Sequence, residues 1–492
     1  MDVHEWLNKG YEIWIWMLDH LIVINFIFSI LIVFFQRREP KLVWTWLVVL
    51  NFIPIFGFLL YLVFGQNLYK MRMFQIKEIE DKLNFIMRTQ KESFWKENYL
   101  KEVDRQNRFS DLFLYNLEVA GAVYTQKNKV KVFIEGNDKF DTLLKDIENA
   151  KHYIHLQYYI IRDDEVFRKI SALLIQKAKQ GVIIRILYDS LGSVVMPKRV
   201  WKRLKKEGIK VGEFFPATFK RFHFRINYRN HRKIVIIDGK IAYVGGINIG
   251  REYISKNEKY GHWRDTHMRL EGACVVSLQL LFSLDWNYTT RENLFATLDY
   301  FSEQIPSDVS HIPVQIISSG PDSCYCVIRD NYLRMIHKAA KSIYIQTPYF
   351  IPDEAILSAL KIAIKSGVDV QLMIPSKPDH PFVYWATYSY MGELLEEGAR
   401  CYIYEKGFLH VKGMMVDQEI CCFGTANMDI RSFELNFEVN ALIHNREITQ
   451  EMEGYFQKDK EDSREITKFV YSKRPLLIRF KEQCCRLLSP LL

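Results

Sequence analysis

Two stretches of the sequence place a histidine and a lysine two residues apart. His231 and Lys233 precede the apolar run IVIID, and His410 and Lys412 precede GMMVD. The run KIVIID is apolar and β-branched enough to be a buried strand, and residues two apart leave the same face of a strand. An imidazole beside an ammonium suits an anionic substrate, because the ammonium neutralises charge while the imidazole attacks or transfers a proton.

The match between the two stretches continues beyond each pair. An aspartate follows each lysine at the same interval, and small residues and an asparagine follow each aspartate at equal intervals. These positions are Asp238, Gly245, Gly246 and Asn248 in the first copy and Asp417, Gly424, Thr425 and Asn427 in the second. A single H-x-K pair is a weak pattern, since a lone histidine in a strand is more often a hydrogen-bonded core residue. The complete pattern, present twice, favours a catalytic role.

The two copies lie inside a longer internal repeat. The segment at 153–165 resembles the one at 343–354, and the segment at 170–189 resembles the one at 357–375. Each copy alternates a strand pattern, a helix pattern and a second strand pattern, which predicts an α/β sandwich with a largely parallel or mixed sheet. Two similar lobes related by a pseudo-twofold axis are therefore expected.

The N-terminal part of the chain contains two long apolar stretches. Residues 14–35 and 43–64 are each long enough, at about 1.5 Å per residue, to cross a hydrocarbon core of about 30 Å. A cleaved signal peptide is disfavoured because the first residues are not basic and no small-residue cleavage site follows. Two buried helices of a soluble core are a weaker alternative for such long runs. We expect a two-helix transmembrane hairpin over 1–64 and a charged helical connector over 65–110.

Charge and cysteine usage bear on the compartment. More lysines and arginines flank the outer ends of the predicted hairpin than occupy its turn, which favours a cytoplasmic catalytic domain in a multi-pass cell-membrane protein. The net charge of +9 suits an anionic partner, and the apolar spans favour a membrane over nucleic acid. The eight cysteines show no zinc spacing, and several lie in apolar runs, as reduced core residues do.

These motifs together resemble the phospholipase D superfamily, and within it the bacterial cardiolipin synthases. The stretches that carry the resemblance span the chain: RRxPxxxWxW, RNHRKIVIIDG, GGINIGREY, SSGPDS, IQTPYF, RSFELNFEV and RLLSPLL. The resemblance implies two pseudo-twofold-related phospholipase D-like α/β sandwich lobes. We place the first lobe at 111–305 and the second at 306–492, the latter with a C-terminal amphipathic helix.

The resemblance also implies a mechanism. One histidine attacks phosphorus and the other protonates the leaving alkoxide; by family likeness His231 is the nucleophile and His410 the general acid. Lys233 and Lys412 neutralise the phosphate, and Asp238 and Asp417 are counted with the histidines and lysines as the catalytic residues of the motifs. Asn248 and Asn427 are candidate phosphate-binding donors. No metal and no cofactor is expected, because a lysine beside each histidine would repel a cation.

The acids that orient the histidines need a separate argument. Asp238 lies an odd number of residues after His231, so on a regular strand its carboxylate leaves the opposite face, and it is expected to cap a turn instead. The next strand-like segment of each copy offers another acid. We predict that Asp265 contacts His231 and that Glu438 contacts His410, each within about 3.2 Å.

The substrate is expected to be an anionic phospholipid. A basic and aromatic segment near the first motif reads as a headgroup-binding rim, or alternatively as a solvated loop: Lys220, Arg221, Phe222, Phe224, Arg225, Tyr228, Arg229 and Arg232. The C-terminal stretch has an apolar helical stripe, suited to a membrane interface or to core packing: Leu476, Leu477, Phe480, Cys484, Leu487 and Leu488.

The expected activity is that of a phosphatidyltransferase. The chain would join two phosphatidylglycerol molecules at a bilayer, giving cardiolipin and glycerol through a phosphohistidine. The alternatives are a membrane-anchored phospholipase D or phosphodiesterase that hydrolyses the same class of bond, and a catalytically silent lipid-binding scaffold. Nucleic acid is not an expected partner, and a homo-oligomer is left open.

Overall fold

The computed structural model describes most of the chain beyond residue 107. The described residues are 12, 15, 16, 20, 23, 25–27, 29, 30, 40–52, 57, 108–216 and 228–489, the last range without 304, 309, 324 and 378. The chain divides into two compact units, one built from residues 1–81 with 219–227, and one built from nearly all the rest.

The first unit contains helix α3 (Pro40–Phe52), in which Trp46 and Leu50 are buried and Asn25 Nδ2 donates to the Leu50 carbonyl at 3.0 Å. Within the described residues, no helix has the length and apolarity needed to cross a bilayer. Most of the predicted hairpin, and nearly all of the predicted connector over 65–110, lies outside the described residues, so both stay predictions.

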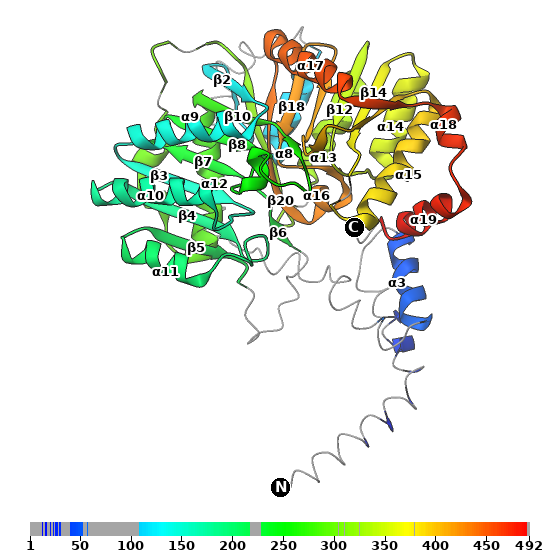
Figure 1. Ribbon diagram of the computed structural model, residues 1–492, viewed down its shortest axis with the longest axis horizontal. Helices are drawn as coiled ribbons and strands as arrows, with labels where there is room; N and C mark the ends of the chain where they lie inside the picture. Colours follow the sequence, from blue (N-terminus) through cyan, green and yellow to red (C-terminus); the bar gives the residue numbers. More distant parts are fainter. Residues whose placement is uncertain are drawn as a thin grey trace. The chain divides into compact units, whose positions relative to one another are not determined.

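The second unit contains two sheets, seen side by side in Figure 1. The first sheet has the strand order β2 (Asn128–Phe133), β10 (His267–Gly272), β8 (Ile241–Gly245), β7 (Ile234–Ile237), β3 (Tyr153–Tyr158), β4 (Ile183–Asp189) and β5 (Lys210–Phe214). Strands β3, β4 and β5 are parallel, and β7, β8, β10 and β2 are antiparallel to their neighbours. Helices α9 (Gly136–Asn149), α10 (Glu165–Lys179), α11 (Lys198–Lys206) and α12 (Cys274–Thr290) belong to this lobe.

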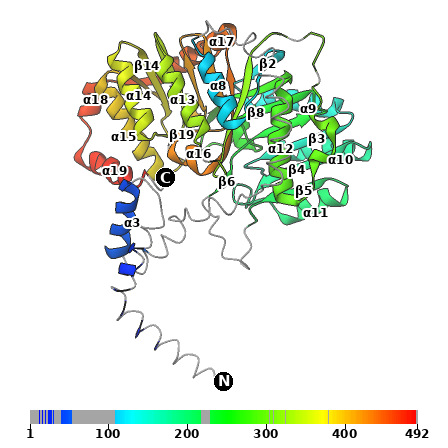
Figure 2. The same ribbon diagram turned by 180° about the vertical axis from the view of Figure 1, so that it is seen from behind.

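The second sheet repeats this mixed pattern. Its order is β1 (Tyr124–Thr125), β11 (Val314–Ser319), β20 (Asn436–Ile443), β18 (Ile420–Gly424), β17 (Gly413–Val416), β12 (Ser342–Gln346), β14 (Asp369–Pro375), β15 (Arg400–Tyr404) and β21 (Ser463–Ile466). Its helices include α13 (Val327–Lys338), α14 (Glu354–Lys365), α15 (Pro381–Glu397), α16 (Ile430–Glu434) and α17 (Arg446–Glu461) (Figure 2).

The predicted repeat is confirmed in its central elements. In the first copy the buried strand β3 leads to Asp164, whose side chain accepts from the backbone N–H groups of Val166 and Phe167 and caps α10. In the second copy β12 leads to Asp353, which caps α14 by accepting from the Ile356 N–H. A side-chain oxygen at this position satisfies an N–H group that the first helical turn cannot.

One predicted boundary is wrong. The first lobe was expected to begin at residue 111, but helix α8 (Ser110–Ala120) lies there, and strand β1, which follows it, pairs with β11 of the second sheet. Phe109, Leu112 and Phe113 are buried in the core of the second lobe. From residue 108 the described chain therefore runs first through the second lobe and enters the first lobe at β2, because the apolar face of α8 packs on α13 and β11.

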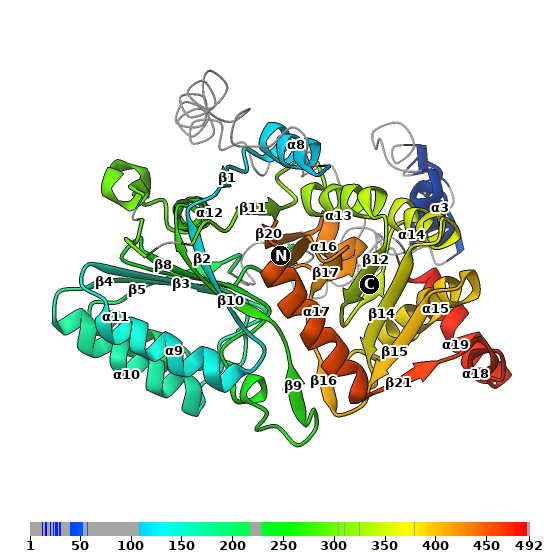
Figure 3. The same ribbon diagram turned by 90° about the horizontal axis from the view of Figure 1, so that it is seen from above.

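Two short strand pairs join the lobes to each other. Strand β6 (Arg229–Asn230) lies parallel to β20, and strand β16 (Gly407–Leu409) lies parallel to β9 (His262–Arg264). Figure 3 shows β9 and β16 running alongside each other between the two sheets. The residues that follow β6 and β16 are the two H-x-K motifs, so each motif lies where the chain passes between the lobes.

Candidate active site

His231 is held against the second lobe. Its backbone N–H donates to the Phe437 carbonyl at 2.9 Å and continues the register in which Asn230 faces Phe437. The next position along β20 is Glu438, and its two carboxylate oxygens lie 2.9 and 3.0 Å from His231 Nδ1. The carbonyl of Thr425 lies 3.1 Å from the same nitrogen. A buried carboxylate at this place fixes Nδ1 as the protonated nitrogen of the ring.

His410 is held against the first lobe in the same way. Its backbone N–H donates to the Arg264 carbonyl at 2.7 Å, and Leu409 faces Arg264 in the β16–β9 pair. The next residue, Asp265, brings Oδ2 to 2.6 Å from His410 Nδ1. Gly246 is required beside this acid, since a Cβ there would lie 2.1 Å from Asp265 Oδ1.

The predicted pairing of acids and histidines is therefore wrong. Asp265 and Glu438 do contact the two histidines, but each contacts the histidine of the opposite lobe. The prediction took each acid from the next strand of the same copy. The strand before each H-x-K motif leaves its own sheet and pairs with the acid-bearing strand of the other lobe, so the partners are exchanged.

Each lysine is buried and bonded to the backbone of its own motif. Lys233 Nζ donates to the His231 carbonyl at 2.7 Å, and Lys412 Nζ donates to the His410 carbonyl at 2.5 Å. Burial, together with the charge of Lys412 and against the opposing effect of Glu438, lowers the pKa of Lys233 to about 7. Burial lowers the pKa of Lys412 to about 8. The two ammonium groups thus lie within electrostatic reach of each other, and an anion between them would relieve both the burial and the repulsion.

Both imidazoles are neutral at neutral pH. Burial lowers the pKa of His410 to about 4, with a further contribution from Lys412, against the opposing effect of Asp265. Burial likewise lowers the pKa of His231, against the opposing effect of Glu438. Among the described residues, no hydrogen-bond partner is found for Nε2 of either ring. Each Nε2 lone pair is therefore available for attack or proton transfer.

Aromatic rings that the sequence did not single out line the histidines. The Tyr159 ring lies edge-on at 4.9 Å from the His231 ring, and Lys233 Nζ lies 5.6 Å from the Tyr159 ring. Trp263 lies 5.0 Å from the His410 ring. The sequence gives one indication that Trp263 lies at the site, namely its position two residues before Asp265 in GHWRDTH.

The motif aspartates do not touch the histidines. Asp238 accepts from the backbone N–H groups of Lys151, His152 and Tyr153 at 2.7–2.8 Å, at the turn between β7 and β8. Asp417 accepts from three successive N–H groups, at 340–342, each at 2.7 Å. The expectation that Asp238 does not hold His231 is confirmed: its carboxylate joins the β7–β8 turn to the segment before β3, and Asp417 joins the equivalent turn to the segment before β12. A catalytic part for either aspartate stays a prediction.

The two asparagines differ in how they are engaged. Asn248 Oδ1 accepts from the Ile160 N–H at 3.1 Å, and its Nδ2 donates to the Tyr253 hydroxyl at 3.0 Å. Asn427 is buried, and its Oδ1 has no partner among the described residues. Phosphate binding by Asn248 and Asn427 stays a prediction, and the side chain of Asn427 is the freer of the two.

The predicted headgroup rim needs correction. Arg232 is buried and forms an ion pair with Asp285 at 2.8 Å, and Tyr228 is buried as well, so neither is a rim residue. Arg229 is also buried. The rest of that segment, Lys220, Arg221, Phe222, Phe224 and Arg225, lies outside the described residues.

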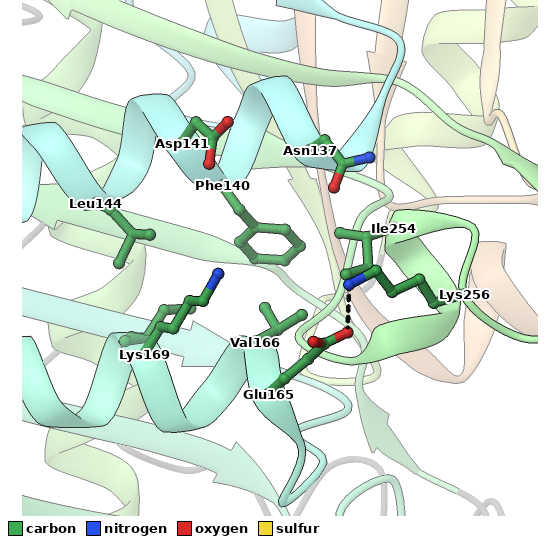
Figure 4. A pocket seen from close by; sticks show the side chains of 10 residues that line it. Asn137, Phe140, Asp141, Leu144, Glu165, Val166, Lys169, Ile254 and Lys256 are labelled. Atoms are coloured by element: carbon green, nitrogen blue, oxygen red, sulfur yellow. Dashed lines mark ion pairs between the residues drawn. The ribbon is translucent and has the colours of Figure 1, made fainter.

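A hollow on the first lobe lies apart from the histidines. Figure 4 shows it between α9 and α10, with Phe140 at its floor and an ion pair between Lys256 and Glu165 at 2.9 Å. None of its lining residues belongs to either H-x-K motif or to the acids that bind the histidines. We assign it no part in the chemistry.

Comparison with known proteins gives the same family over nearly the whole chain. Residues 143–263 and 332–460 match the family described as cardiolipin synthase, PLD-like domain, and residues 23–66 match the phospholipase D-nuclease N-terminal family. The chain is 46% identical over 483 residues to the major cardiolipin synthase of Bacillus subtilis, covering 97% of this chain and 99% of that protein. A cardiolipin synthase of Listeria monocytogenes is 44% identical over 481 residues, with the same shares.

A solved structure supports the fold. The crystal structure of the phosphatidylserine synthase of Haemophilus influenzae superposes with a TM-score of 0.60 at 12% identity, covering 78% of this chain and 100% of that chain. At that identity the likeness concerns the fold alone. Taken with the close full-length relatives and the two matched domains, it leaves one assignment: the chain belongs to the cardiolipin synthase family of phospholipase D-like proteins.

Proposed function

We propose that the chain transfers a phosphatidyl group from one phosphatidylglycerol to the free glycerol hydroxyl of another, releasing glycerol and forming cardiolipin. The observation that carries the proposal is the pair of neutral imidazoles, each with Nδ1 fixed by a buried acid of the opposite lobe and Nε2 unbonded. One imidazole can then attack phosphorus while the other handles the proton.

The first half-reaction forms a phosphohistidine. Nε2 of His231 attacks phosphorus, the bond from phosphorus to the glycerol oxygen breaks, and the imidazolium of His410 gives its proton to that oxygen. His410 is neutral in the free protein, so it must gain this proton as the anionic substrate binds, which raises its pKa. Asp265 stabilises the imidazolium through its bond to Nδ1.

The second half-reaction runs the same path with another alcohol. His410, now neutral, accepts the proton of the acceptor hydroxyl, whose oxygen attacks phosphorus as the bond to His231 breaks. Lys233 and Lys412 neutralise the charge that develops on the phosphate oxygens in both steps. Preorganised charges in a site without water act more strongly than the same charges in solvent.

Membrane association is supported by the C-terminal helices α18 (Lys468–Ser472) and α19 (Leu476–Leu487). The apolar stripe of α19 faces outward, although the helix itself packs on the second lobe through its other side. Leu476, Leu477, Phe480 and Leu487 are exposed by 64–80%. The opposite side of α19 packs on α15 through Cys485, and a two-point ion pair of Glu482 with Arg474 lies beneath it.

The charges around this outward face suit an anionic bilayer. Lys473, Arg479 and Lys481 are exposed beside the leucines, and Phe469 of α18 is 65% exposed. Apolar side chains flanked by lysine and arginine are typical of a helix that lies in the headgroup layer. We propose that this face rests on the cytoplasmic leaflet, where phosphatidylglycerol is the substrate, and that the N-terminal hairpin crosses the same membrane.

The hydrolase alternative differs only in the second nucleophile. Water in place of the acceptor hydroxyl would give phosphatidic acid, and a silent scaffold would give no product. The full chain incubated with phosphatidylglycerol in mixed micelles tests all three. Cardiolipin and glycerol in equal amounts are expected; phosphatidic acid as the main product, or no product, would contradict the proposal.

A further inference from the structure

Cardiolipin contains two phosphodiesters joined by one glycerol, so the acceptor must carry a second phosphate near the reacting one. If the proposed function holds, the phosphate of the donor lies between the histidines while the acceptor phosphate lies one P–O–C–C–C–O–P chain away. The two lysines of the motifs are already used by the donor phosphate. A second anion next to them needs its own cation, because two phosphates close together repel each other.

Strand spacing places the backbone of a buried arginine at about this distance from His231. Arg229 lies two residues before His231 on the extended segment that includes β6, so both side chains leave the same face. Two residues of strand span roughly 6.6 Å at about 3.3 Å per residue. That spacing is comparable to the distance between two phosphorus atoms joined by one glycerol.

The charge of Arg229 is offset in part by the carboxylate of Asp189, which does not form a direct ion pair with it. Its Nη1 donates to the Tyr228 carbonyl at 2.6 Å, and among the described residues no carboxylate forms an ion pair with it. Asp189 is within electrostatic range, but its oxygens accept from the N–H groups of Leu191, Gly192 and Asn230. Arg232, by contrast, has its own carboxylate partner. A buried guanidinium without a paired carboxylate is unfavourable unless an anion completes it.

The surroundings of Arg229 also point to the site. Burial lowers its pKa, Asp189 and Tyr159 act in the opposite direction, and the charge of Arg431, at the start of α16, adds to the lowering. The same two arginines act on Tyr159, whose ring contacts His231. Two positive charges and a phenol thus gather beside the first histidine, from both lobes.

The repeat shows that this feature is not part of the shared motif. The position two residues before His410 is Phe408, which is fully buried and packs on Trp263 at 5.0 Å. At this position of the repeat, the described residues therefore place a cation before His231 and an aromatic ring before His410.

We propose that Arg229 binds the phosphodiester of the acceptor lipid and so selects an anionic lipid alcohol over glycerol or water. It is a specificity-determining residue and takes no part in bond making. The inference rests on the proposed function, and it names the residue that distinguishes the acceptor from any other alcohol.

The experiment compares two reactions of the same full-length protein in mixed micelles of phosphatidylglycerol. Cardiolipin formation uses an acceptor with a phosphate, whereas incorporation of labelled glycerol into phosphatidylglycerol uses an acceptor without one. We expect Arg229→Gln to lower the ratio of synthesis to exchange by roughly tenfold or more, because hydrogen bonds to charged groups are among the stronger ones. Arg229→Lys keeps the charge but lacks the planar guanidinium, so its ratio of synthesis to exchange should lie between those of Arg229→Gln and the unmodified protein.

The controls separate this inference from the proposed function and from folding. Lys240→Gln, at an exposed position near the first motif, should keep both rates. If both rates of Arg229→Gln fall together, or neither falls, Arg229 does not bind the acceptor phosphate. If Arg229→Gln does not fold, the ratio of synthesis to exchange measured for Arg229→Lys tests the inference, and an unchanged ratio would contradict it. Absence of both reactions in the unmodified protein would overturn the proposed function instead.

Discussion

Glu438 of the second lobe holds Nδ1 of His231, which follows a strand of the first lobe, with its carboxylate oxygens at 2.9 and 3.0 Å. Asp265 of the first lobe holds His410 at 2.6 Å in return. Each lobe thus completes the histidine of the other. A shift of one lobe against the other by a small part of a hydrogen-bond length would disturb both imidazoles. The inter-lobe strands β6 and β16 therefore position both candidate catalytic histidines as well as joining the lobes.

The crossed pairs predict which double variants are additive. Glu438→Gln should lower synthesis by roughly 10³–10⁴-fold, because an amide cannot hold the ring in the same tautomer. In a His410→Ala background, Asp265→Asn should cost little more, whereas Glu438→Gln should cost nearly its full effect. Steady-state rates of synthesis by Glu438→Gln, by His410→Ala and by the two double variants measure this additivity. Coupling of Asp265 with His231, and not with His410, would contradict the crossed arrangement.

The division of labour between the histidines predicts where a label is trapped. His410→Ala removes the proton carrier, with a loss of roughly 10²–10⁴-fold for that role. Phosphatidylglycerol labelled in its phosphate should then leave label on His231 if the intermediate accumulates, as peptide mapping would show. Label on His410 in a His231→Ala protein would reverse the assignment.

The buried lysines predict an alkaline limit to activity. Burial lowers the pKa of Lys233 to about 7 and that of Lys412 to about 8, from an ordinary value of about 10.4. The charged form is lost as pH rises through these values, so kcat/KM for phosphatidylglycerol should fall on the alkaline side of neutrality. The alkaline fall in kcat should occur at a higher pH than the fall in kcat/KM, because the bound phosphodiester favours the ammonium form of the lysines. A kcat/KM that stays flat to the ordinary lysine pKa would rule out these lysines as the phosphate-binding charges.

Asp417 predicts a change in stability rather than in chemistry. Burial raises its pKa, but three backbone N–H groups and Arg108 outweigh this, so its pKa lies below the ordinary value. Its charge therefore stabilises the fold above the unfolded pKa of about 3.9, and the contribution is lost as pH falls through the lower folded pKa. Asp417→Asn should lower the free energy of unfolding by about 1–3 kcal/mol at neutral pH.

Thermal unfolding of Asp417→Asn beside the exposed control Asp299→Asn would check this. The difference in unfolding midpoint between the two variants should become smaller as the pH is lowered. A normal unfolding midpoint combined with complete loss of synthesis would instead give Asp417 a direct part in the reaction.

The outward face of α19 predicts a contact with lipid. A fluorescent label at Leu477→Cys should be quenched by brominated lipids in vesicles rich in phosphatidylglycerol. The labelled protein has exposed Cys484, half-buried Cys326 and Cys324, which lies outside the described residues, replaced by serine. The same label at Leu298→Cys, which is 71% exposed outside this helix pair, should be quenched much less. Equal quenching at both positions would argue against a specific docking face, and protection of Leu477 only at high protein concentration would indicate a second copy of the chain.

The sequence by itself predicted the chemistry of this protein and determined the repeat that carries its motifs. The paired spacing of His231, Lys233, His410 and Lys412 is local, and so is the odd offset that excluded Asp238 as a partner of its histidine. Both follow from the two-residue period of an extended chain, which needs no knowledge of distant segments. The two acids were also found, because each stands in a strand-like segment soon after its motif.

Only the tertiary structure decided which acid serves which histidine. Adjacency in sequence favoured Asp265 for His231, but hydrogen bonds between β6 and β20, and between β16 and β9, join segments far apart in the chain. The same holds for α8, which packs on the second lobe, and for α19, whose apolar stripe is turned outward by contacts of Glu482 and Cys485. Strand pairing and side-chain packing depend on which surfaces meet in space, and a periodic pattern of residues specifies a face without specifying its partner.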